Sequence, residues 1–281
     1  VGLPVSIQTS GTVSLNAGGA VGSETTPLKI AAGEAISAST TTGSIDITGV
    51  NGDTIFGMLS SGQDIRIASE TGKLTLTEDL NAQNGLISVT SAKDMVLDKN
   101  LIAKNDVNIT AAEGINHTEG AISSAQGSVN VTNTTSGDIT VQDMSGVNIN
   151  VTNNAADADV TLAGTLSGDT TSGKVTVTSQ RDIKQTGDSV AIVAKSAALT
   201  AVGGSIGVKP PVGGSVKVNV DTIDASAQNG SIYLDSPDHD LTLGNIAATD
   251  EINIKTSGTT GDLTLNNALN GNTIILGSAH D

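Results

Sequence analysis

A short apolar–polar–apolar phrase recurs along this chain at a nearly constant spacing, and it constrains the fold more than any other feature. The phrase follows Gly or Asp and precedes Thr, Ser or Asn, as in Ile-Asp-Ile-Thr at 45–48, Val-Asn-Ile-Thr at 107–110 and Leu-Thr-Leu-Asn at 263–266. Apolar residues at every second position are typical of a short β-strand with one buried face. The chain therefore consists of many brief strands.

The spacing of equivalent phrases gives the length of the repeat. The distance from Ile65 to Ile87 is 87 − 65 = 22 residues, from Ile87 to Val107 it is 107 − 87 = 20, and from Val107 to Val129 it is 129 − 107 = 22. Other phrases fall midway between such positions, so each repeat of about 21 residues carries at least two strands joined by short turns. Segments this short leave no room for the helical crossovers of an α/β sheet.

This pattern predicts an all-β fold, a parallel β-helix (β-solenoid) with roughly 20–22 residues per coil and about 13 coils, forming a rod of about 60 Å. Hydrophobic residues make up 37% of the chain, and only one Phe, one Tyr and no Trp are among them. Small aliphatic side chains can fill a narrow interior that repeats along an axis. The structural alternative is an antiparallel β-sandwich, whose core usually relies on large aromatic side chains.

The whole chain, 1–281, is predicted to be a single β-helix domain with two irregular stretches near 21–42 and 209–214. In the second stretch Pro210 and Pro211 cannot belong to a central strand, because proline donates no hydrogen bond to a ladder. Both ends of the chain consist of repeat-like sequence. We therefore expect a segment of a longer polypeptide, or a chain that stacks end to end.

Charge and composition exclude several classes of partner and chemistry. With 13 basic and 29 acidic residues the formal charge is -16, which repels a nucleic-acid backbone or an anionic lipid surface. No run of eighteen apolar residues occurs, so no transmembrane segment is predicted. The absence of cysteine excludes disulfides and thiolate metal sites.

The phrases Gly-Asp-Ile-Thr-Val at 137–141, Gly-Asp-Leu-Thr-Leu at 261–265 and Asn-Asp-Val-Asn-Ile-Thr-Ala at 105–111 resemble the repeat units of filamentous haemagglutinin-like exoproteins. These are large bacterial adhesins exported by two-partner secretion, and the likeness covers most of the chain. The family's Asn-Pro-Asn-Gly type secretion motif is absent, since no Asn-Pro occurs. The resemblance implies a right-handed β-helix that is extracellular, at the bacterial cell surface or secreted.

The same resemblance implies a structural or adhesive role, in adhesion, aggregation or filament and stalk formation, without catalysis. The implied partners are a glycan or protein on a host or neighbouring cell, copies of the chain itself, and an outer-membrane export partner. The alternative is a carbohydrate-active β-helix enzyme, a polysaccharide lyase or glycosidase that uses clustered carboxylates. Such enzymes normally offer aromatic platforms, which this chain lacks, and we predict no catalytic or cofactor-binding residues.

Aspartate repeatedly stands directly before the apolar phrase. A carboxylate there can accept hydrogen bonds from backbone N–H groups of a turn and so help to begin the strand. The alternative is a calcium ion held between carboxylates, for which Asp238 and Asp240, on either side of His239, are the candidates. No other cofactor is predicted, and the histidines, His117 among them, are expected to be solvated turn residues. The aspartates before a phrase include Asp64, Asp94, Asp106, Asp138, Asp159, Asp182, Asp240 and Asp262.

Six Asn-x-Ser/Thr sequons make N-glycosylation a further possibility for a secreted chain. Outward Asn and Thr are so common in this sequence that chance can also produce them. The sequons begin at Asn108, Asn116, Asn130, Asn133, Asn150 and Asn229.

Overall fold

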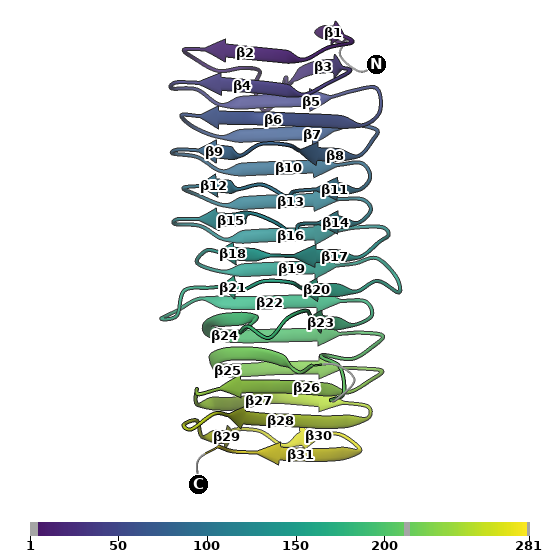
Figure 1. The fold of residues 1–281 in the computed structure, drawn as a ribbon, viewed down its shortest axis with the longest axis vertical. Helices are drawn as coiled ribbons and strands as arrows, with labels where there is room; N and C mark the ends of the chain where they lie inside the picture. Colours follow the sequence, from purple (N-terminus) through teal and green to yellow (C-terminus); the bar gives the residue numbers. More distant parts are fainter. Residues whose placement is uncertain (1–4, 211–213, 280–281) are drawn as a thin grey trace. The chain divides into compact units, whose positions relative to one another are not determined.

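The computed structural model describes residues 5–210 and 214–279, and in this part of the chain it is all-β, without a helix (Figure 1). Parallel strands stack as a β-solenoid of about 12 turns. The predicted fold class is thus confirmed, and the antiparallel sandwich is wrong, because strands pair in parallel with the equivalent strand one coil later.

The chain divides into two compact units, residues 1–134 and 135–281. The single continuous domain stays a prediction. Of the irregular stretch 209–214, residues 211–213 lie outside the described part. No helix of the described residues is long and apolar enough to cross a membrane.

The first unit contains sixteen strands in its described residues, most of them three to five residues long. They are β1 (Ile7–Thr9), β2 (Val13–Ala17), β3 (Leu28–Ala32), β4 (Ile36–Thr40), β5 (Ile45–Gly49), β6 (Thr54–Ser61), β7 (Ile65–Ser69), β8 (Leu74–Leu76), β9 (Leu80–Ala82), β10 (Ile87–Ser91), β11 (Met95–Val96), β12 (Leu101–Ala103), β13 (Val107–Ala111), β14 (Ile115–Asn116), β15 (Ala121–Ser124) and β16 (Val129–Asn133).

The second unit contains fifteen strands in its described residues, including longer ones that turn a corner without a break. They are β17 (Ile139–Val141), β18 (Asp143–Ser145), β19 (Ile149–Asn153), β20 (Val160–Leu162), β21 (Leu166–Ser167), β22 (Lys174–Ser179), β23 (Ile183–Gln185), β24 (Ile192–Ala201), β25 (Val216–Ala227), β26 (Ile232–Pro237), β27 (Leu241–Ala248), β28 (Glu251–Ser257), β29 (Leu263–Leu265), β30 (Leu269–Asn270) and β31 (Thr273–Gly277).

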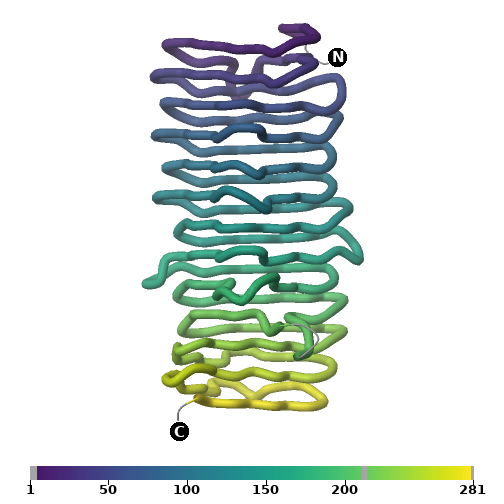
Figure 2. Tube along the Cα trace, viewed as in Figure 1, coloured from purple at the N-terminus to yellow at the C-terminus, as the bar shows by residue number. Residues whose placement is uncertain are grey.

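A regular coil of the first unit has three strands, one more than the minimum that the spacing required. β10, β11 and β12 form one such coil, and they pair with β7, β8 and β9 of the coil before. The path of the backbone through these coils can be followed in Figure 2. β11 is only two residues long, so its alternation is too brief to be recognised in the sequence.

The core of the first unit is a stack of aliphatic side chains in register. Ile45, Ile65, Ile87, Val107 and Val129 occupy the same position of successive coils, and each is fully buried. A fully buried aliphatic side chain contributes on the order of 1.5–3 kcal/mol. Because every layer covers the next, a thin interior of small side chains suffices, and the scarcity of aromatic residues follows.

Aspartates at the corners connect successive coils. Asp64 Oδ1 accepts a hydrogen bond from the backbone N–H of Leu86 at 2.9 Å, and Asp106 Oδ1 accepts one from Ser128 at 2.8 Å. Backbone N–H groups are therefore the donors, as predicted, but they belong to the next coil and not to the aspartate's own turn. The same bond is made by Asp53, Asp79, Asp94, Asp98, Asp138, Asp143, Asp159, Asp182, Asp224, Asp238 and Asp240.

Buried hydroxyl groups close the same corners from the inside. The Ser91 hydroxyl lies 2.9 Å from the carbonyl oxygen of Asp94 and 3.1 Å from that of Gly72 in the preceding coil. Ser61 does the same with Asp64 and Gly43. The carbonyl oxygens of Asp64 and Asp94 also accept a backbone N–H, from Ile45 and Leu74, so each hydroxyl adds a second hydrogen bond at the corner.

The stretch 21–42, expected to be irregular, contains the two regular strands β3 and β4. Only residues 22–27 leave the coil, and a hydrogen bond from the backbone N–H of Thr26 to Ser23 Oγ (3.1 Å) closes this loop. The prediction for His117 is wrong, since its side chain is fully buried. His117 directly follows Asn116 of β14, so strand alternation points it inward.

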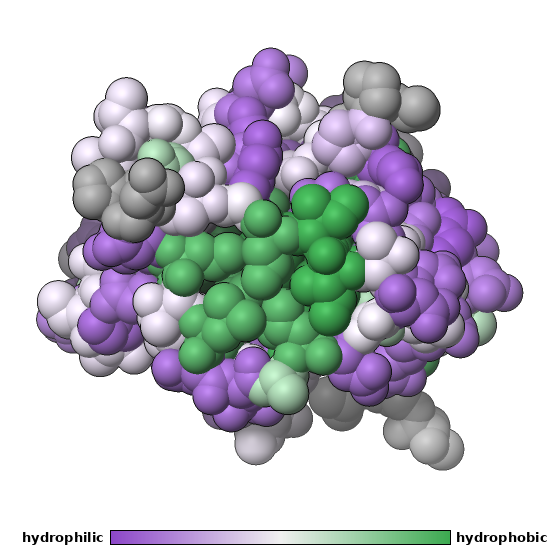
Figure 3. All heavy atoms as spheres, turned by 90° about the horizontal axis from the view of Figure 1, so that it is seen from below, coloured by the Kyte–Doolittle hydropathy of each residue, from purple (hydrophilic) through white to green (hydrophobic). Residues whose placement is uncertain are grey.

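The last described coil of the second unit exposes residues of the type that fills the interior elsewhere. Ile274 and Leu276 of β31 are 44% and 37% exposed, whereas their partners Ile252 and Ile254 in β28 are fully buried. Figure 3 shows the apolar surface that results. The difference measures how much each coil relies on the next to cover it.

Gly244, at a corner of the second unit, allows the contact between a corner aspartate and the next coil to be tested. A Cβ on Gly244 would overlap Asp224 Oδ1, which accepts the N–H of Asn245 at 2.7 Å, while the next nearest atom is 3.2 Å away. We expect Gly244→Ala to lower the free energy of unfolding by about 1–3 kcal/mol. Chemical denaturation measures the loss.

The double variant Asp224→Ala/Gly244→Ala supplies the control. Removing the carboxylate removes the overlap, so the two substitutions together should cost less than the sum of the single ones, with a coupling of about 1 kcal/mol. Additive losses would show that the carboxylate is not what excludes a side chain at Gly244.

Candidate functional site

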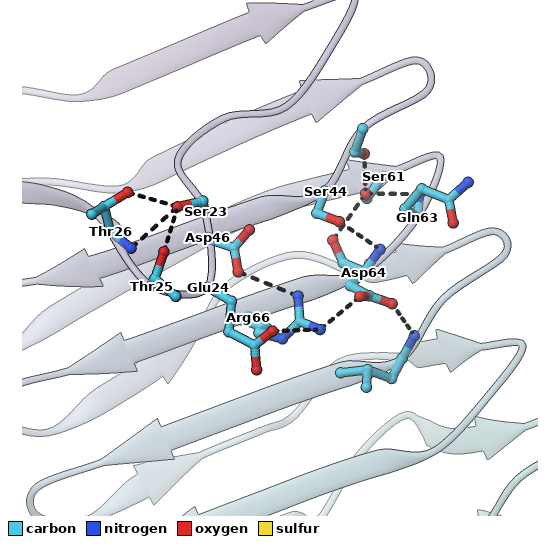
Figure 4. Close-up of polar contacts among 12 residues, drawn as sticks. Ser23, Glu24, Thr25, Thr26, Ser44, Asp46, Ser61, Gln63, Asp64 and Arg66 are labelled. Carbon is cyan, nitrogen blue, oxygen red and sulfur yellow. Dashed lines mark hydrogen bonds and ion pairs between the residues drawn. The ribbon is translucent and has the colours of Figure 1, made fainter.

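Arg66 gathers three carboxylates on the outer face of the first unit (Figure 4). Its Nη2 lies 2.7 Å from Asp64 Oδ2 and 3.8 Å from Glu24 Oε2, and its Nη1 lies 3.4 Å from Asp46 Oδ1. Three negative charges thus surround one positive charge. We name these four residues the Arg66 cluster.

The repeat itself places two of these carboxylates. Asp46 of β5 and Arg66 of β7 are register partners in adjacent strands, so their side chains lie side by side on the outer face. Asp64 precedes Arg66 by two residues and therefore points to the same face.

Glu24 reaches the cluster only because the loop 22–27 folds over β5. Gly22 begins this loop with φ at +72°, and a Cβ at that position would overlap the Asp46 carbonyl oxygen. Glycine is therefore required on both counts. A bridge between Val21 and Ile45 fixes the start of the loop against the sheet.

The loop and the sheet enclose a shallow hollow of about 170 Å³. Hydroxyl groups and small apolar surfaces alternate in its lining. Besides Glu24, Asp46 and Arg66, it is lined by Pro27, Ile47, Thr48, Ile67, Ala68, Ser88 and Thr90.

Asp46 is the unusual member of the cluster. Its side chain is only 3% exposed, and burial raises its pKa above 3.8 although the nearby guanidinium of Arg66 acts to lower it. Burial also acts to lower the pKa of Arg66, but its carboxylate neighbours outweigh this and raise it. Folding thus disfavours the ionised form of Asp46, a feature that is more frequent at functional sites than elsewhere.

A second charged cluster, in the second unit, shows the opposite behaviour. Asp159 is 8% exposed and accepts hydrogen bonds from Arg181 Nε (2.6 Å), Arg181 Nη2 (2.7 Å), Lys184 Nζ (2.5 Å) and the backbone N–H of Asp182 (3.1 Å). Burial acts to raise its pKa, yet these bonds prevail and lower it to about 2. A carboxylate so fully satisfied has a structural role, connecting two coils.

Polar side chains in register continue the outer face beside the hollow. Asn130 Nδ2 donates to Asn108 Oδ1 at 2.8 Å, one coil apart. Thr90, Thr110 and Thr132 are register partners in β10, β13 and β16. This face is a surface of stacked hydroxyl and amide groups.

The calcium candidates Asp238 and Asp240 lie in the second unit and line a hollow with Asp221 and His239. Their Oδ1 atoms already accept the N–H groups of Thr259 and Asp262. Within the described residues, no group of three or more His, Cys, Asp or Glu side chains is placed to hold a metal ion. Bound calcium stays a prediction.

The six sequons lie in different surroundings. Asn116 and Asn229 are exposed, Asn108, Asn130 and Asn150 are half-buried on outer strand faces, and Asn133 is fully buried. A folded chain has no room for a glycan on a buried Asn133. Glycosylation of the others stays a prediction.

Sequence reasoning did not find the Arg66 cluster. The signal was present, because Asp46 and Arg66 occupy the outward position of equivalent phrases, 66 − 46 = 20 residues apart. What could not be foreseen is the loop that brings Glu24 to them.

Comparison with models of known protein families, with curated proteins and with solved structures finds no significant match to this chain.

Substitution of Asp46 should stabilise the protein. Since folding raises the pKa of this carboxyl, its ionised form at neutral pH opposes folding, and the opposition disappears as the pH falls through the raised pKa. We expect Asp46→Asn to raise the melting temperature at pH 7 and to leave it almost unchanged near pH 3. A lower melting temperature at pH 7 would show that the carboxylate stabilises the fold.

Substitution of Asp159, in contrast, should destabilise the protein. With a pKa of about 2 in the folded state, this group stabilises the fold above about pH 4, and the contribution is lost as the pH falls through about 2. Asp159→Asn should therefore cost about 2 kcal/mol at pH 7 and flatten the acid limb of the stability profile. Denaturation at several pH values measures both, and an unchanged acid limb would contradict the assignment.

Proposed function

We propose that this chain is a structural and adhesive segment of a large bacterial exoprotein, secreted or held at the cell surface, that acts without catalysis. The observation that carries the proposal is the stacking of coils in register. It fills the interior with aliphatic side chains and leaves the polar side chains of each coil in regular columns on the outside. Such a surface is suited to contact with another large molecule.

The resemblance of the Gly-Asp phrases to filamentous haemagglutinin-like repeats supports the same role. Under this proposal the chain would leave the cell through an outer-membrane export partner. Its outer faces would contact a glycan or protein of a host or neighbouring cell, or other copies of the chain. The acidic character of the chain, with a formal charge of -16, favours partners that are neutral or basic.

The test is binding without turnover. We expect the purified chain to bind saturably and reversibly to cells or to surfaces coated with cell-surface glycans, and to release no reducing sugar from acidic or neutral polysaccharides. An unrelated acidic protein of similar net charge is the control for nonspecific attachment.

Two outcomes would contradict the proposal. One is the absence of binding to any surface beyond that of the control protein. The other is release of reducing sugar that disappears in the variant Asp46→Asn/Asp64→Asn, which would identify a carbohydrate-active enzyme.

A further inference from the structure

A further hollow lies on the outside of the second unit, where equivalent strands of three successive coils end. In β25, β27 and β30, Ser226 pairs with Ala247, and Ala247 pairs with Asn270. Preceding coils carry threonine at this outward position, as Thr178 and Thr200 do. Because a short alanine stands at 247, the surface is recessed there, and the hollow has a volume of about 320 Å³. We name it the Ala247 notch.

The charge of the lining determines the class of ligand that fits the Ala247 notch. None of the described residues that line it is charged. An anion would find no cation there and would be repelled by the chain, whose formal charge is -16. An ammonium group or a metal ion would find no carboxylate in the lining. The ligand that fits is therefore uncharged.

The lining offers groups that both donate and accept hydrogen bonds. Gln228, Asn270 and Asn272 are exposed, and no described residue engages their side-chain amides. The hydroxyl groups of Ser226 and Thr249 lie beside them. A primary amide donates and accepts at once, so it can pair with two neighbouring hydroxyl groups of one molecule. The lining thus matches a ligand that is rich in hydroxyl groups.

The backbone at the notch is already used by the ladder between coils. The N–H of Gln228 donates to the carbonyl oxygen of Ala201 at 3.0 Å. The N–H of Thr249 donates to that of Ala227 at 3.2 Å. An extended peptide that relies on main-chain hydrogen bonds would find neither group free. A sugar ring needs no such partner, because its hydroxyl groups can pair with side chains and its apolar side can lie on Ala247.

The first unit contains a hollow of the same construction, at the ends of β1, β3 and β5. Successive pairings make these strands the equivalents of β27 and of the second half of β25. Gln8 and Asn51 supply the amides, and Thr9 and Ser10 supply the hydroxyl groups. The recessed alanine is Ala31, and no described residue of this lining is charged. The sequences around the two hollows differ, so their common chemistry is a second, independent indication of one class of ligand.

We propose that the Ala247 notch binds an uncharged sugar residue, whose hydroxyl groups exchange hydrogen bonds with Gln228, Asn270 and Asn272. The hollow at Ala31 binds the same class of ligand. The inference deepens the proposed adhesive function, on which its biological meaning rests, and it identifies the glycan partner as one that presents neutral sugars.

The experiment titrates small sugars into the whole chain and follows backbone amide resonances. Methyl β-galactoside, methyl α-mannoside and N-acetylglucosamine are the uncharged probes, and glucuronate is the charged probe of the same ring size. We expect saturable shifts at residues 226–228, 247–249 and 270–272, and also at 8–10 and 31–33, with at least one uncharged probe. Glucuronate should bind more weakly, and added salt should leave the uncharged probe unaffected, because no ion pair is formed.

Two variants and a control make the test specific. Ala247→Ile fills the notch with a side chain that suits a strand, so binding at the notch should be lost while the shifts at the Ala31 hollow persist. Gln228→Ala should weaken binding at the notch about fivefold. Ala198→Ile is the matched control, because Ala198 is a half-buried alanine on the outer face of β24, in register with Thr176. It should leave both hollows unaffected.

Three outcomes would overturn the inference: no saturable shift at the notch with any uncharged probe, an equal response to glucuronate, or undiminished binding at the notch in Ala247→Ile. Failure of the inference is distinguishable from failure of the proposed function. Attachment to cells without a response to any uncharged probe would refute the notch and leave the adhesive function standing. Sugar binding by a chain that attaches to no cell would support the notch and refute the adhesive function.

Discussion

Residue-for-residue register between successive coils is the constraint on which the rest of this structure depends. Ile87 lies between Ile65 and Val107, and every inward position of that strand repeats the arrangement. Each side chain must then fit directly between two of its own kind, which favours aliphatic residues of similar size. The corner aspartates hold the same register from outside, because each carboxylate accepts an N–H group of the next coil, as Asp64 does from Leu86.

Register also decides which polar side chains meet, and the two charged clusters differ in how many donors each buried carboxylate has. Asp159 receives four hydrogen bonds, three of them from charged side chains, whereas Asp46 has one contact to a guanidinium shared with two other carboxylates. The hydrogen bonds around Asp159 stabilise its ionised form and lower its pKa, whereas burial disfavours the ionised form of Asp46 and raises its pKa. The contrast separates a structural ion pair from a candidate binding site without reference to any relative.

Much of this fold was predictable, because in a solenoid the residues that lie one repeat apart in the sequence are neighbours in the structure. Spacing alone gave the parallel pairing of Ile65 with Ile87, and alternation gave the buried positions. Two-residue strands such as β11 escaped prediction, since no alternation can be read in two residues. His117 escaped because a polar side chain occupies an inward position. The Arg66 cluster was not predicted because its third carboxylate, Glu24, belongs to the loop 22–27. The path of this loop depends on its contacts with β5 and not on the sequence repeat.

The position of that cluster has a physical reason. If every coil carried an aspartate where Asp46 stands, like charges would repeat about every 4.8 Å along the face and repel one another. The column instead continues with Arg66, Ser88, Asn108 and Asn130, so the charge is confined to its first members. A regular solenoid face can repeat neutral polar groups without limit, whereas a carboxylate in the column needs a cation beside it, as Asp46 has in Arg66. The loop 22–27 interrupts the repeat beside this pair and adds a third carboxylate, Glu24, which no period in the sequence could have placed there.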